Sequence, residues 1–277
     1  MNPRRRNRRL MAALACACAL TAVATPPGAA AAPRARASIV GGGSANPAEW
    51  PYAVAIFRKG HMHCGGSVIS PTKVLTAGHC VAGFNLANFQ VITGRSNLRV
   101  QASGQVIGVS SGRVHPDFEQ TGLHDVAVLN LAQPTMAPPI TLATPVQSAA
   151  ATGAGARLRV AGYGATNPFG SHLSPFLKQT SEIVRNDRRC LKAYTSDLFA
   201  PDSMICALGS KRKKAGRFKI HTSACSGDSG GPLVADTPTG PLEVGTVSYG
   251  GALCGLPSAP TVYSRVSASL DFIDAPG

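Results

Sequence analysis

The stretch ACSGDSGGP, residues 224–232, places Ser229 directly after an aspartate and among three glycines. Glycine-rich runs are usually turns, because glycine adopts backbone conformations that other residues avoid. A serine hydroxyl is a poor nucleophile unless a neighbouring base removes its proton. The stretch therefore predicts either a plain turn or a backbone shaped around a reactive hydroxyl, and the rest of the sequence decides between them.

Two further stretches carry the side chains that a reactive serine needs. The segment LTAGHC ends with His79 next to a cysteine, and the segment HDVAVLNL places Asp125 at the start of a strongly apolar run. A histidine can take the serine proton near neutral pH, and a buried aspartate fixes the histidine tautomer and stabilises the imidazolium. The three residues together predict nucleophilic catalysis by Ser229.

The glycines around Ser229 have a role in the same chemistry. Gly227 lets the backbone turn so that the N–H groups of Gly227 and Ser229 point at one spot, as in an oxyanion hole. Taken singly, each candidate also has a structural explanation: a core or surface histidine, a strand-end aspartate, or a serine in a glycine loop. The functional interpretation rests on their occurrence together.

The remaining sequence has the pattern of an all-β protein. The chain has 277 residues, with 30 glycines and 21 prolines, which suits many turns and few long helices. A Pro/Ala/Gly-rich connector is predicted over 134–155, and only the tail, 267–273, looks helical. Short apolar runs bounded by turn residues predict strands at 52–57, 66–70, 73–78, 89–94, 105–110, 126–131, 157–164, 230–235, 242–250 and 261–266. Two such clusters of strands predict two β-barrels or sandwiches in tandem.

The first 32 residues have the composition of a secretory signal peptide. Five arginines precede an apolar run over 10–23, and small residues follow at 29–32. A retained membrane anchor is disfavoured because the apolar run is short and Pro26-Pro27-Gly28 follows it. We therefore expect a secreted, extracellular protein without a stable membrane anchor. Asn7-Arg8-Arg9-Leu10 weakly resembles a twin-arginine signal, so the Sec and twin-arginine routes both stay open.

Six of the eight cysteines lie beyond this leader. An even number in an oxidising compartment predicts disulfides, and six cysteines allow 15 pairings. No two of them are two to four residues apart, as a zinc site prefers, and the stretch 93–111 has no carboxylate for a calcium site. We expect no metal and no cofactor. The six cysteines are Cys64, Cys80, Cys190, Cys206, Cys225 and Cys254.

The net charge of +14 overstates how basic the mature protein is. The first 38 residues contain seven arginines and no acidic residue, which leaves 20 basic against 13 acidic residues. Six of these basic residues fall within 211–219, inside a loop predicted over 209–222. The rest is nearly neutral, so nucleic-acid binding is not predicted. The basic loop is either a solvated surface loop or a contact site for acidic substrates, cell-wall polymers or anionic surfaces.

Eight motifs occur in an order and spacing that resemble the trypsin/chymotrypsin family of serine proteases. They are IVGG (39–42), CGGSVIS (64–70), TAGHC (76–80), HDVAVLNL (124–131), GYG (162–164), CSGDSGGPL (225–233), VSYG (247–250) and VYSRV (262–266). The resemblance covers 39–273. Separately, the Arg-rich leader and the Ala/Gly/Arg bias of the composition suggest a GC-rich bacterial source. It implies two antiparallel six-stranded β-barrels with a short C-terminal helix, bounded at 39–142 and 143–277. It also implies a serine endopeptidase that forms an acyl-enzyme, with His79, Asp125 and Ser229 as its triad.

The resemblance implies three disulfides as well. Cys64–Cys80 would brace the catalytic histidine, Cys225–Cys254 would brace the substrate pocket, and Cys190–Cys206 would close a loop of the second barrel. Each such bridge typically contributes about 2–4 kcal/mol to stability.

The IVGG motif implies synthesis as a zymogen with a short propeptide over 33–38. In the family, cleavage before the isoleucine frees an ammonium group, here that of Ile39, which pairs with the aspartate preceding the nucleophile, here Asp228. The sequence departs from the family because Ser38, and not lysine or arginine, precedes Ile39. The activating cut therefore falls either after Arg36, with trimming of two residues, or at Ser38 by a different protease.

The resemblance also assigns a specificity pocket. Its floor is Ser223, where members that cleave after lysine or arginine carry aspartate, so a neutral pocket is implied. Thr261 stands where glycine is common, and its branched side chain would shorten the cavity. The expected preference is for small to medium apolar residues before the scissile bond, with aromatic residues second. The other wall of the pocket is Ser248, Tyr249 and Gly250.

Two other functions compete with the protease interpretation. A non-catalytic binding protein on the same fold would use the basic segment 211–219 as its contact surface, although all three triad residues are present. An α/β-hydrolase esterase would place its histidine last in the chain, whereas His79 comes first. The expected partners are protein or peptide substrates, an activating protease and a proteinaceous inhibitor, and the protein is expected to be a monomer.

Overall fold

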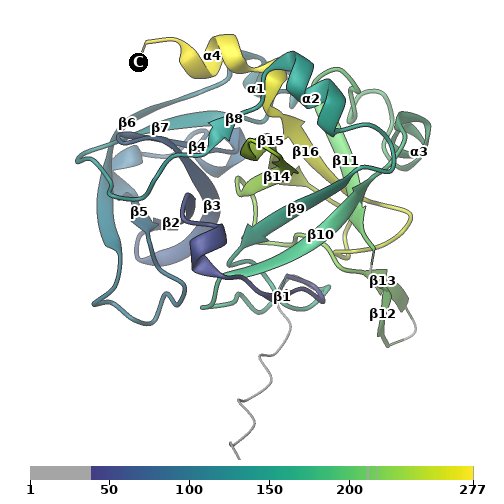
Figure 1. Ribbon diagram of the computed structural model, residues 1–277, viewed down its shortest axis with the longest axis horizontal. Coiled ribbons are helices and arrows are strands. Elements are labelled where there is room, and N and C mark those ends of the chain that lie inside the picture. The colour runs from purple at the N-terminus through teal and green to yellow at the C-terminus, as the bar shows by residue number, and fades with distance from the viewer. Residues whose placement is uncertain (1–38, 211, 217, 277) are drawn as a thin grey trace, which may run out of the picture. The chain divides into compact units, whose positions relative to one another are not determined.

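The first half of the chain folds into a closed barrel of six antiparallel strands (Figure 1). The computed structural model describes residues 39–210, 212–216 and 218–276; the signal peptide and propeptide predicted for 1–38 lie outside the described residues. The barrel order is β2-β3-β4-β7-β6-β5. The strands are β2 (Ala53–Arg58), β3 (His61–Ser70), β4 (Lys73–Thr76), β5 (Phe89–Thr93), β6 (Gln105–Val114) and β7 (Ala127–Leu131).

The second half of the chain forms a second closed barrel. Its order is β10-β11-β16-β15-β14-β9, and pairing of β9 with β10 completes the ring. The strands are β9 (Arg157–Gly162), β10 (Lys178–Val184), β11 (Met204–Gly209), β14 (Pro232–Thr237), β15 (Gly240–Tyr249) and β16 (Thr261–Arg265). Two short strands, β1 (Gly43–Ser44) and β8 (Thr141–Leu142), add to its edges. Two antiparallel six-stranded barrels confirm the predicted fold class.

Hydrophobic patterning explains why these segments become strands. In β6, Ile107 and Val109 are buried while their neighbours are exposed, which is the period-2 pattern of a strand with one face on the core. In β7, four of five residues are buried, which explains why its sequence is nearly all apolar and does not alternate. Trp50, Ile56 and Phe89 are among the fully buried side chains of the first core. These patterns are visible in the sequence, which is why the strand positions could be predicted.

Helices were underpredicted. The tail contains α4 (Leu270–Asp274), as expected, but three more short helices occur: α1 (Pro116–Thr121), α2 (Pro145–Ala151) and α3 (Asp187–Ala193). The predicted connector 134–155 therefore contains β8 and α2, and α2 is stabilised by a capping box between Thr144 and Gln147. Helices of two turns carry too few apolar residues for a 3.6-residue period to show. No helix in the described part of the chain is long and apolar enough to cross a membrane.

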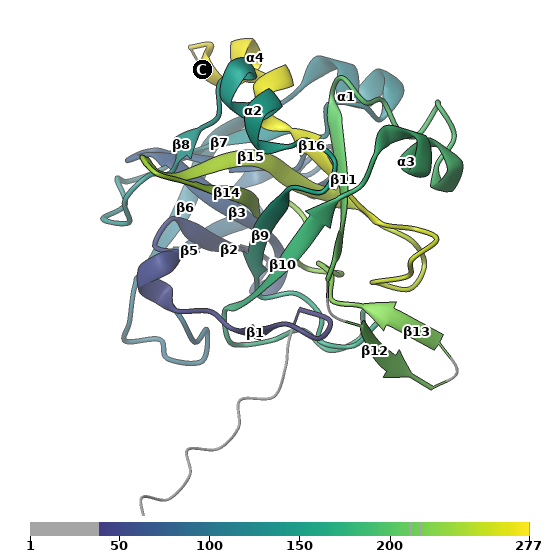
Figure 2. The same ribbon diagram turned by 45° about the vertical axis from the view of Figure 1, so that its right-hand side comes forward.

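Two strands and a hairpin were also missed. The sequence KQTSEIV of β10 mixes polar and apolar residues, and β11 is buried along its whole length, so neither alternates clearly. The basic segment predicted as a loop contains a two-stranded hairpin, β12 (Arg212–Ala215) and β13 (Phe218–His221). The hairpin projects away from the barrel strands (Figure 2). Gly216, with a positive φ of 58°, supplies the turn that the sequence pattern did not reveal.

A buried carboxyl, Glu243 of β15, is expected to make the stability of the fold depend on pH. Glu243 is fully buried, and neither of its oxygens has a well-formed hydrogen bond, although the Ser67 hydroxyl of β3 lies next to it. Burial raises the pKa of Glu243 to about 8 from its ordinary value of 4.5. The folded protein therefore binds one more proton than the unfolded chain between these pH values, and its stability falls as the pH rises through this window.

Glu243→Gln is expected to stabilise the protein at alkaline pH. At pH 9 the glutamine removes the cost of a buried charge, and the free energy of unfolding should rise by at least about 1 kcal/mol. Below pH 4.5 Glu243 is protonated in both the folded and the unfolded protein, so the wild type and Glu243→Gln should differ little in stability. Thermal unfolding of both proteins at pH 4 and pH 9 measures the effect. An equal shift at both pH values would show that Glu243 is not the titrating group.

Candidate active site

His79 and Asp125 are brought together by the pairing of β4 with β7. Thr76 of β4 lies opposite Ala127 of β7, so the 3₁₀ turn Gly78–Cys80 and the residues before β7 share one edge of the barrel. The His79 Nδ1 and Asp125 Oδ2 atoms are 2.7 Å apart, and the His79 backbone N–H donates to Asp125 Oδ1 at 2.8 Å. Asp125 is only 2% exposed. The arrangement fixes the imidazole ring and leaves Nε2 as the nitrogen that faces outward.

Ser248 joins this pair from the second barrel. Its hydroxyl donates to Asp125 Oδ2 at 2.6 Å, which gives the buried carboxylate a third hydrogen bond. Ser248 is predicted from the sequence only as part of the pocket wall, and it does line the cavity described below. Its contact with Asp125 was missed, because nothing in the sequence indicates that the end of β15 meets the start of β7.

The loop that carries Ser229 is tied to both barrels. The Gly65 N–H of β3 donates to the Ser229 carbonyl at 2.7 Å, and the Gly230 N–H donates to Val247 of β15 at 2.7 Å. Gly230 has a positive φ of 81°, and a Cβ atom there would come within 2.1 Å of Thr76 Oγ1. Only glycine permits this approach, which places Ser229 against the strand that leads to His79.

Ser229 and His79 both lie close to the Cys64–Cys80 disulfide. Cys80 Sγ is 3.8 Å from His79 Nε2 and 3.8 Å from the Ser229 carbonyl oxygen. Among the described residues, no hydrogen bond joins the Ser229 hydroxyl to the imidazole. Such contacts are often long in ligand-free sites and tighten when a substrate is bound. The His79 side chain is 37% exposed, so it is accessible to a substrate.

Two backbone N–H groups of the same loop are available to a ligand. Gly227 has a positive φ of 89°, and a Cβ atom there would lie 2.7 Å from Leu173 Cδ2. The intervening Asp228 N–H donates to the Cys225 carbonyl, which closes the turn. Within the described residues, neither the Gly227 N–H nor the Ser229 N–H donates to a protein acceptor. The Gly227 and Ser229 N–H groups are the two hydrogen-bond donors predicted from the sequence to form an oxyanion hole.

Asp228 is buried in a slot that two glycines form. Its Oδ1 accepts from the Gly164 N–H at 2.7 Å, and its Oδ2 accepts from the Cys225 N–H at 3.0 Å. A Cβ atom on Gly162 or Gly164 would come within 2.1 Å or 2.4 Å of its carboxyl oxygens. Burial raises the pKa of Asp228 to about 7, and the two hydrogen bonds lower it in part. The motif GYG was recognised in the sequence, but this packing role was not.

Ile39, the predicted partner of Asp228, is also fully buried. The next residue, Val40, accepts a hydrogen bond through its carbonyl from the Ser223 N–H at 3.2 Å. Residues 223–225 therefore contact the chain near Ile39 on one side and Asp228 on the other. Among the described residues no lysine or arginine forms an ion pair with Asp228.

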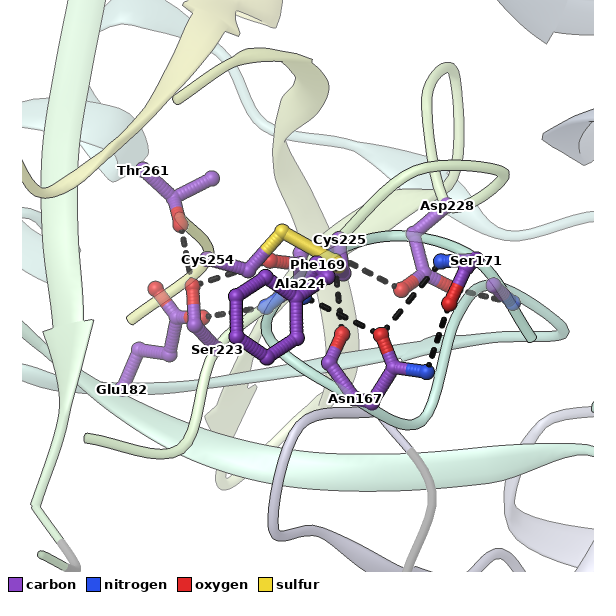
Figure 3. Close-up of a disulfide and its surroundings, with 11 residues drawn as sticks. Asn167, Phe169, Ser171, Glu182, Ser223, Ala224, Cys225, Asp228, Cys254 and Thr261 are labelled. Carbon is purple, nitrogen blue, oxygen red and sulfur yellow. Dashed lines mark hydrogen bonds between the residues drawn. A yellow bond between two sulfur atoms is a disulfide. The ribbon is translucent and has the colours of Figure 1, made fainter. Parts of the chain in front are cut away.

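A cavity of about 200 Å³ opens beside Ser229. Ala224 and Cys225 form part of one wall, and the end of β15 with Gly250 forms another. Thr261 lines the cavity, whereas Ser223 is fully buried behind it, and their hydroxyl oxygens are 2.6 Å apart (Figure 3). Thr261 is thus among the residues that line the cavity, whereas Ser223, the expected floor, is not.

The tyrosine of the predicted pocket wall is held from outside the cavity. Tyr249 donates its hydroxyl to the Leu198 carbonyl, and its ring packs edge-on against Tyr194 with centroids 5.3 Å apart. Tyr194 follows α3 and donates to the Pro260 carbonyl at 2.6 Å. These contacts join α3 to the two segments that border the cavity.

The six cysteines form the three pairs that the family resemblance implies. They are Cys64–Cys80, Cys190–Cys206 and Cys225–Cys254. The last of these is drawn in Figure 3, and both of its cysteines are among the residues that line the cavity. His79 lies close to Cys64 and Cys80, but both sulfurs are consumed in a disulfide, so this group does not supply thiolate ligands to a metal.

Comparison with known proteins agrees with this geometry. A family model described as Trypsin matches residues 39–273, which is nearly all of the described chain. The chain belongs to the trypsin family of serine proteases. It is therefore a serine-type endopeptidase, a hydrolase that acts on peptide bonds of proteins.

Individual members of the trypsin family are similar along most of their length. A protein named trypsin from Saccharopolyspora erythraea is 33% identical over 85% of this chain and 96% of its own. Serine protease 57 of Rattus norvegicus is 32% identical over 85% of this chain and 81% of its own. Phenoloxidase-activating factor 3 of Holotrichia diomphalia is 35% identical over 76% of this chain and 62% of its own.

Proposed function

We propose that this trypsin-family protease cleaves peptide bonds with Ser229 as nucleophile, His79 as general base and Asp125 as the residue that orients the histidine. The observation that carries the proposal is the hydrogen-bonded His79–Asp125 pair, held by Ser248, next to the loop that presents Ser229. A buried carboxylate that accepts three hydrogen bonds orients the imidazole and stabilises the imidazolium that forms during the reaction.

The proposed reaction has two halves. The Ser229 hydroxyl attacks the scissile carbonyl while His79 Nε2 takes its proton, and the carbonyl oxygen gains a negative charge. The Gly227 and Ser229 N–H groups would bind this oxyanion, and each such donor contributes about 3 kcal/mol to the transition state. His79 then protonates the leaving amine, which leaves an acyl group on Ser229. A water molecule, activated by His79 in the same way, releases the acid.

We further propose that the protein is exported and made as a zymogen. The leader composition, the three disulfides and the relatives' family support an extracellular enzyme with a signal peptide over 1–32 and a propeptide over 33–38. Another protease would free Ile39, by a cut at Ser38 or by a cut after Arg36 and trimming. The new ammonium group would then pair with Asp228, and the two barrels, 39–142 and 143–277, would act as one monomeric peptidase.

The cavity supports a preference for small to medium apolar side chains before the scissile bond. Among the residues that the structure describes, no charged side chain lines it, and the hydroxyls of Ser223 and Thr261 bond to each other. A lysine or arginine would have to bury its charge without a paired carboxylate, which is costly. The branched Thr261 side chain shortens the cavity and disfavours large aromatic residues.

Thr261→Gly is expected to shift the substrate preference towards larger side chains. Without the Thr261 side chain the cavity extends towards Ser223, so phenylalanine should fit better before the scissile bond. The ratio of kcat/KM for a phenylalanine substrate to that for a valine substrate should rise about tenfold, since a pocket change of this size contributes 1–3 kcal/mol. Peptides that differ only at this residue measure the ratio. An unchanged ratio would show that Thr261 does not limit the cavity.

One experiment tests the proposed function as a whole. Protein that begins at Ile39 is treated with a fluorophosphonate probe and then profiled on a peptide library. We expect labelling of Ser229 and cleavage after apolar residues. Inertness towards the probe, with the Ile39 terminus verified, would contradict the triad, and cleavage mainly after lysine or arginine would contradict the neutral cavity.

A further inference from the structure

The hairpin β12–β13 belongs to a basic segment that the proposed chemistry does not use. Six basic residues lie within 211–219, and the stretch 209–222 contains no aspartate or glutamate. Without these six, the 20 basic residues that follow the first 38 positions fall to 14, against 13 acidic ones. The excess positive charge is therefore concentrated in one short segment, and the hairpin that it forms projects from the second barrel (Figure 2).

One face of the hairpin is anchored to the rest of the protein. Ile220 of β13 is 2% exposed and belongs to a small apolar cluster with Val40 and Cys225, and Phe218 packs against the same cluster. Lys219, which lies between Phe218 and Ile220, is exposed. This alternation is typical of a strand with one face on the core and the other towards solvent. The hairpin is thus held in place, and the face that carries Lys219 is its outer face.

The register of the two strands gathers basic residues on this outer face. Lys214 of β12 lies directly opposite Lys219, and Arg212 precedes Lys214 by two residues, so the three residues share one face. Like charges directly opposite each other destabilise a sheet. Among the ion pairs of the described residues, none involves Lys219. The hairpin therefore keeps an arrangement that opposes its own folding and that a bound anion would relieve.

The base of the hairpin adjoins the substrate cavity. The N–H of His221, the last residue of β13, donates to the Gly255 carbonyl at 2.7 Å. A Cβ atom on Gly255 would come within 2.1 Å of the His221 carbonyl oxygen, so the two segments are in close contact. Gly255 lines the same cavity as Ser229. A protein with one residue in the cavity therefore has neighbouring segments that can reach the hairpin.

We propose that the outer face of β12–β13, with Arg212, Lys214 and Lys219, is an exosite that binds an acidic segment of a protein substrate while another segment occupies the cavity. The inference rests on the proposed function, because it adds a second contact to the same peptide cleavage. An acidic polypeptide fits better than a separate anionic polymer, because the hairpin adjoins the cavity and one chain can contact both. Two contacts on one chain raise the effective concentration at the second, and the positive charge also speeds the encounter.

The experiment uses peptides that share one cleavage sequence, with valine before the scissile bond. Each carries a tail of glutamate, glutamine or lysine, joined through a flexible Gly/Ser linker either before or after the cleavage sequence. A linker of about ten residues spans about 17 Å, so that the tail can reach beyond the cavity. The protein that begins at Ile39 is assayed at low and at high salt, and kcat and KM are determined separately.

We expect the glutamate tail, in at least one of the two positions, to lower KM about tenfold relative to the glutamine tail at low salt, with kcat nearly unchanged. The lysine tail should raise KM, because it is repelled by the hairpin. At high salt the advantage of the glutamate tail should fall below about twofold, because the Debye length shortens from about 10 Å at 0.1 M to about 3 Å at 1 M.

Variants locate the effect on the hairpin. Lys214→Gln combined with Lys219→Gln should reduce the advantage of the glutamate tail to less than about threefold, whereas the two lysine-to-arginine changes should preserve it. The matched control is Lys59→Gln combined with Arg99→Gln, which also removes two positive charges, at exposed positions in the first half of the chain. The control should keep the full advantage. All these proteins should cleave the glutamine-tailed peptide equally, because none of the four residues lines the cavity.

Equal KM values for the glutamate and glutamine tails in both positions would overturn the inference. An equal loss in the control variant would also overturn it, because the effect would then follow net charge and not the hairpin. If the tails make no difference but the wild type, unlike the variant with glutamine at 214 and 219, cosediments with phosphatidylglycerol vesicles, the hairpin binds lipid and the inference is wrong. Fluorophosphonate labelling of Ser229 separates the two proposals. Absence of labelling overturns the proposed function together with this inference, whereas labelled protein that cleaves all tailed peptides equally overturns this inference only.

Discussion

Ser229→Ala is expected to reduce kcat/KM about 10⁴-fold or more, with little change in KM. The alanine leaves the His79–Asp125 pair, the two backbone donors and the cavity in place but removes the atom that would attack the substrate. Peptide cleavage by the protein that begins at Ile39 measures the loss. Any residual rate would come from binding and oxyanion stabilisation alone, which act on an attacking water molecule.

The control for this variant is Ser110→Ala, which removes an exposed serine hydroxyl of β6 that bonds to the Asn130 carbonyl. It should retain full activity and full labelling by a fluorophosphonate. Thermal unfolding of Ser229→Ala should match that of the wild type, because the hydroxyl has no hydrogen-bond partner among the described residues. Activity above about 1% of the wild type would exclude Ser229 as the nucleophile.

The strands could be predicted because their physical cause is local. In β6 the spacing of apolar residues is set by which face meets the core, and in β7 burial on both faces gives a continuous apolar run; both patterns are visible in the sequence. The helix α3 and the hairpin β12–β13 depend instead on caps and turns, such as the Asn186 cap and Gly216, which are single residues in polar surroundings. These signals are weak in any sequence, so their elements were assigned to loops.

The candidate site shows the same division. His79, Asp125 and Ser229 could be proposed because each stands in a distinctive stretch and because their chemistry requires one another. The contact of Ser248 with Asp125 could not, since it depends on how β15 meets β7 across the two barrels. Glu182 is a further case: on β10 it is one polar residue among several, and only the fold brings its carboxyl to the Ala224 N–H.

Thr261 illustrates a limit of reasoning from motifs. Its position predicted a shortened cavity, and the side chain does line the cavity. The hydrogen bond to Ser223 adds what the motif lacked, because it ties the two hydroxyls together and leaves Ser223 fully buried. A substitution at Ser223 would therefore also break the hydrogen bond to Thr261.

Asp228→Asn is expected to prevent activation even when the chain is cut before Ile39. Asp228 is fully buried between Gly162 and Gly164, and burial raises its pKa to about 7. The ionised carboxylate is therefore costly at this position unless a cation pairs with it. The Ile39 ammonium would supply that cation, and removal of one partner from a buried ion pair costs about 3–5 kcal/mol. Asparagine keeps the shape of the side chain but offers the ammonium no charge, so the Gly227 and Ser229 donors lose their fixed arrangement. We expect kcat/KM to fall about 10²- to 10³-fold.

The position of the new terminus tests the same variant independently of activity. In the cleaved wild type the Ile39 amine should be protected from carbamylation by cyanate, whereas in Asp228→Asn it should react readily. Asp236→Asn is the matched control, since Asp236 is an exposed partner of Arg159 and its loss should change neither reactivity nor kcat/KM. Full activity of Asp228→Asn with a protected terminus would exclude the ion pair as the switch. A reactive terminus with low activity would locate the switch in Asp228, because the catalytic residues of this variant are otherwise unchanged.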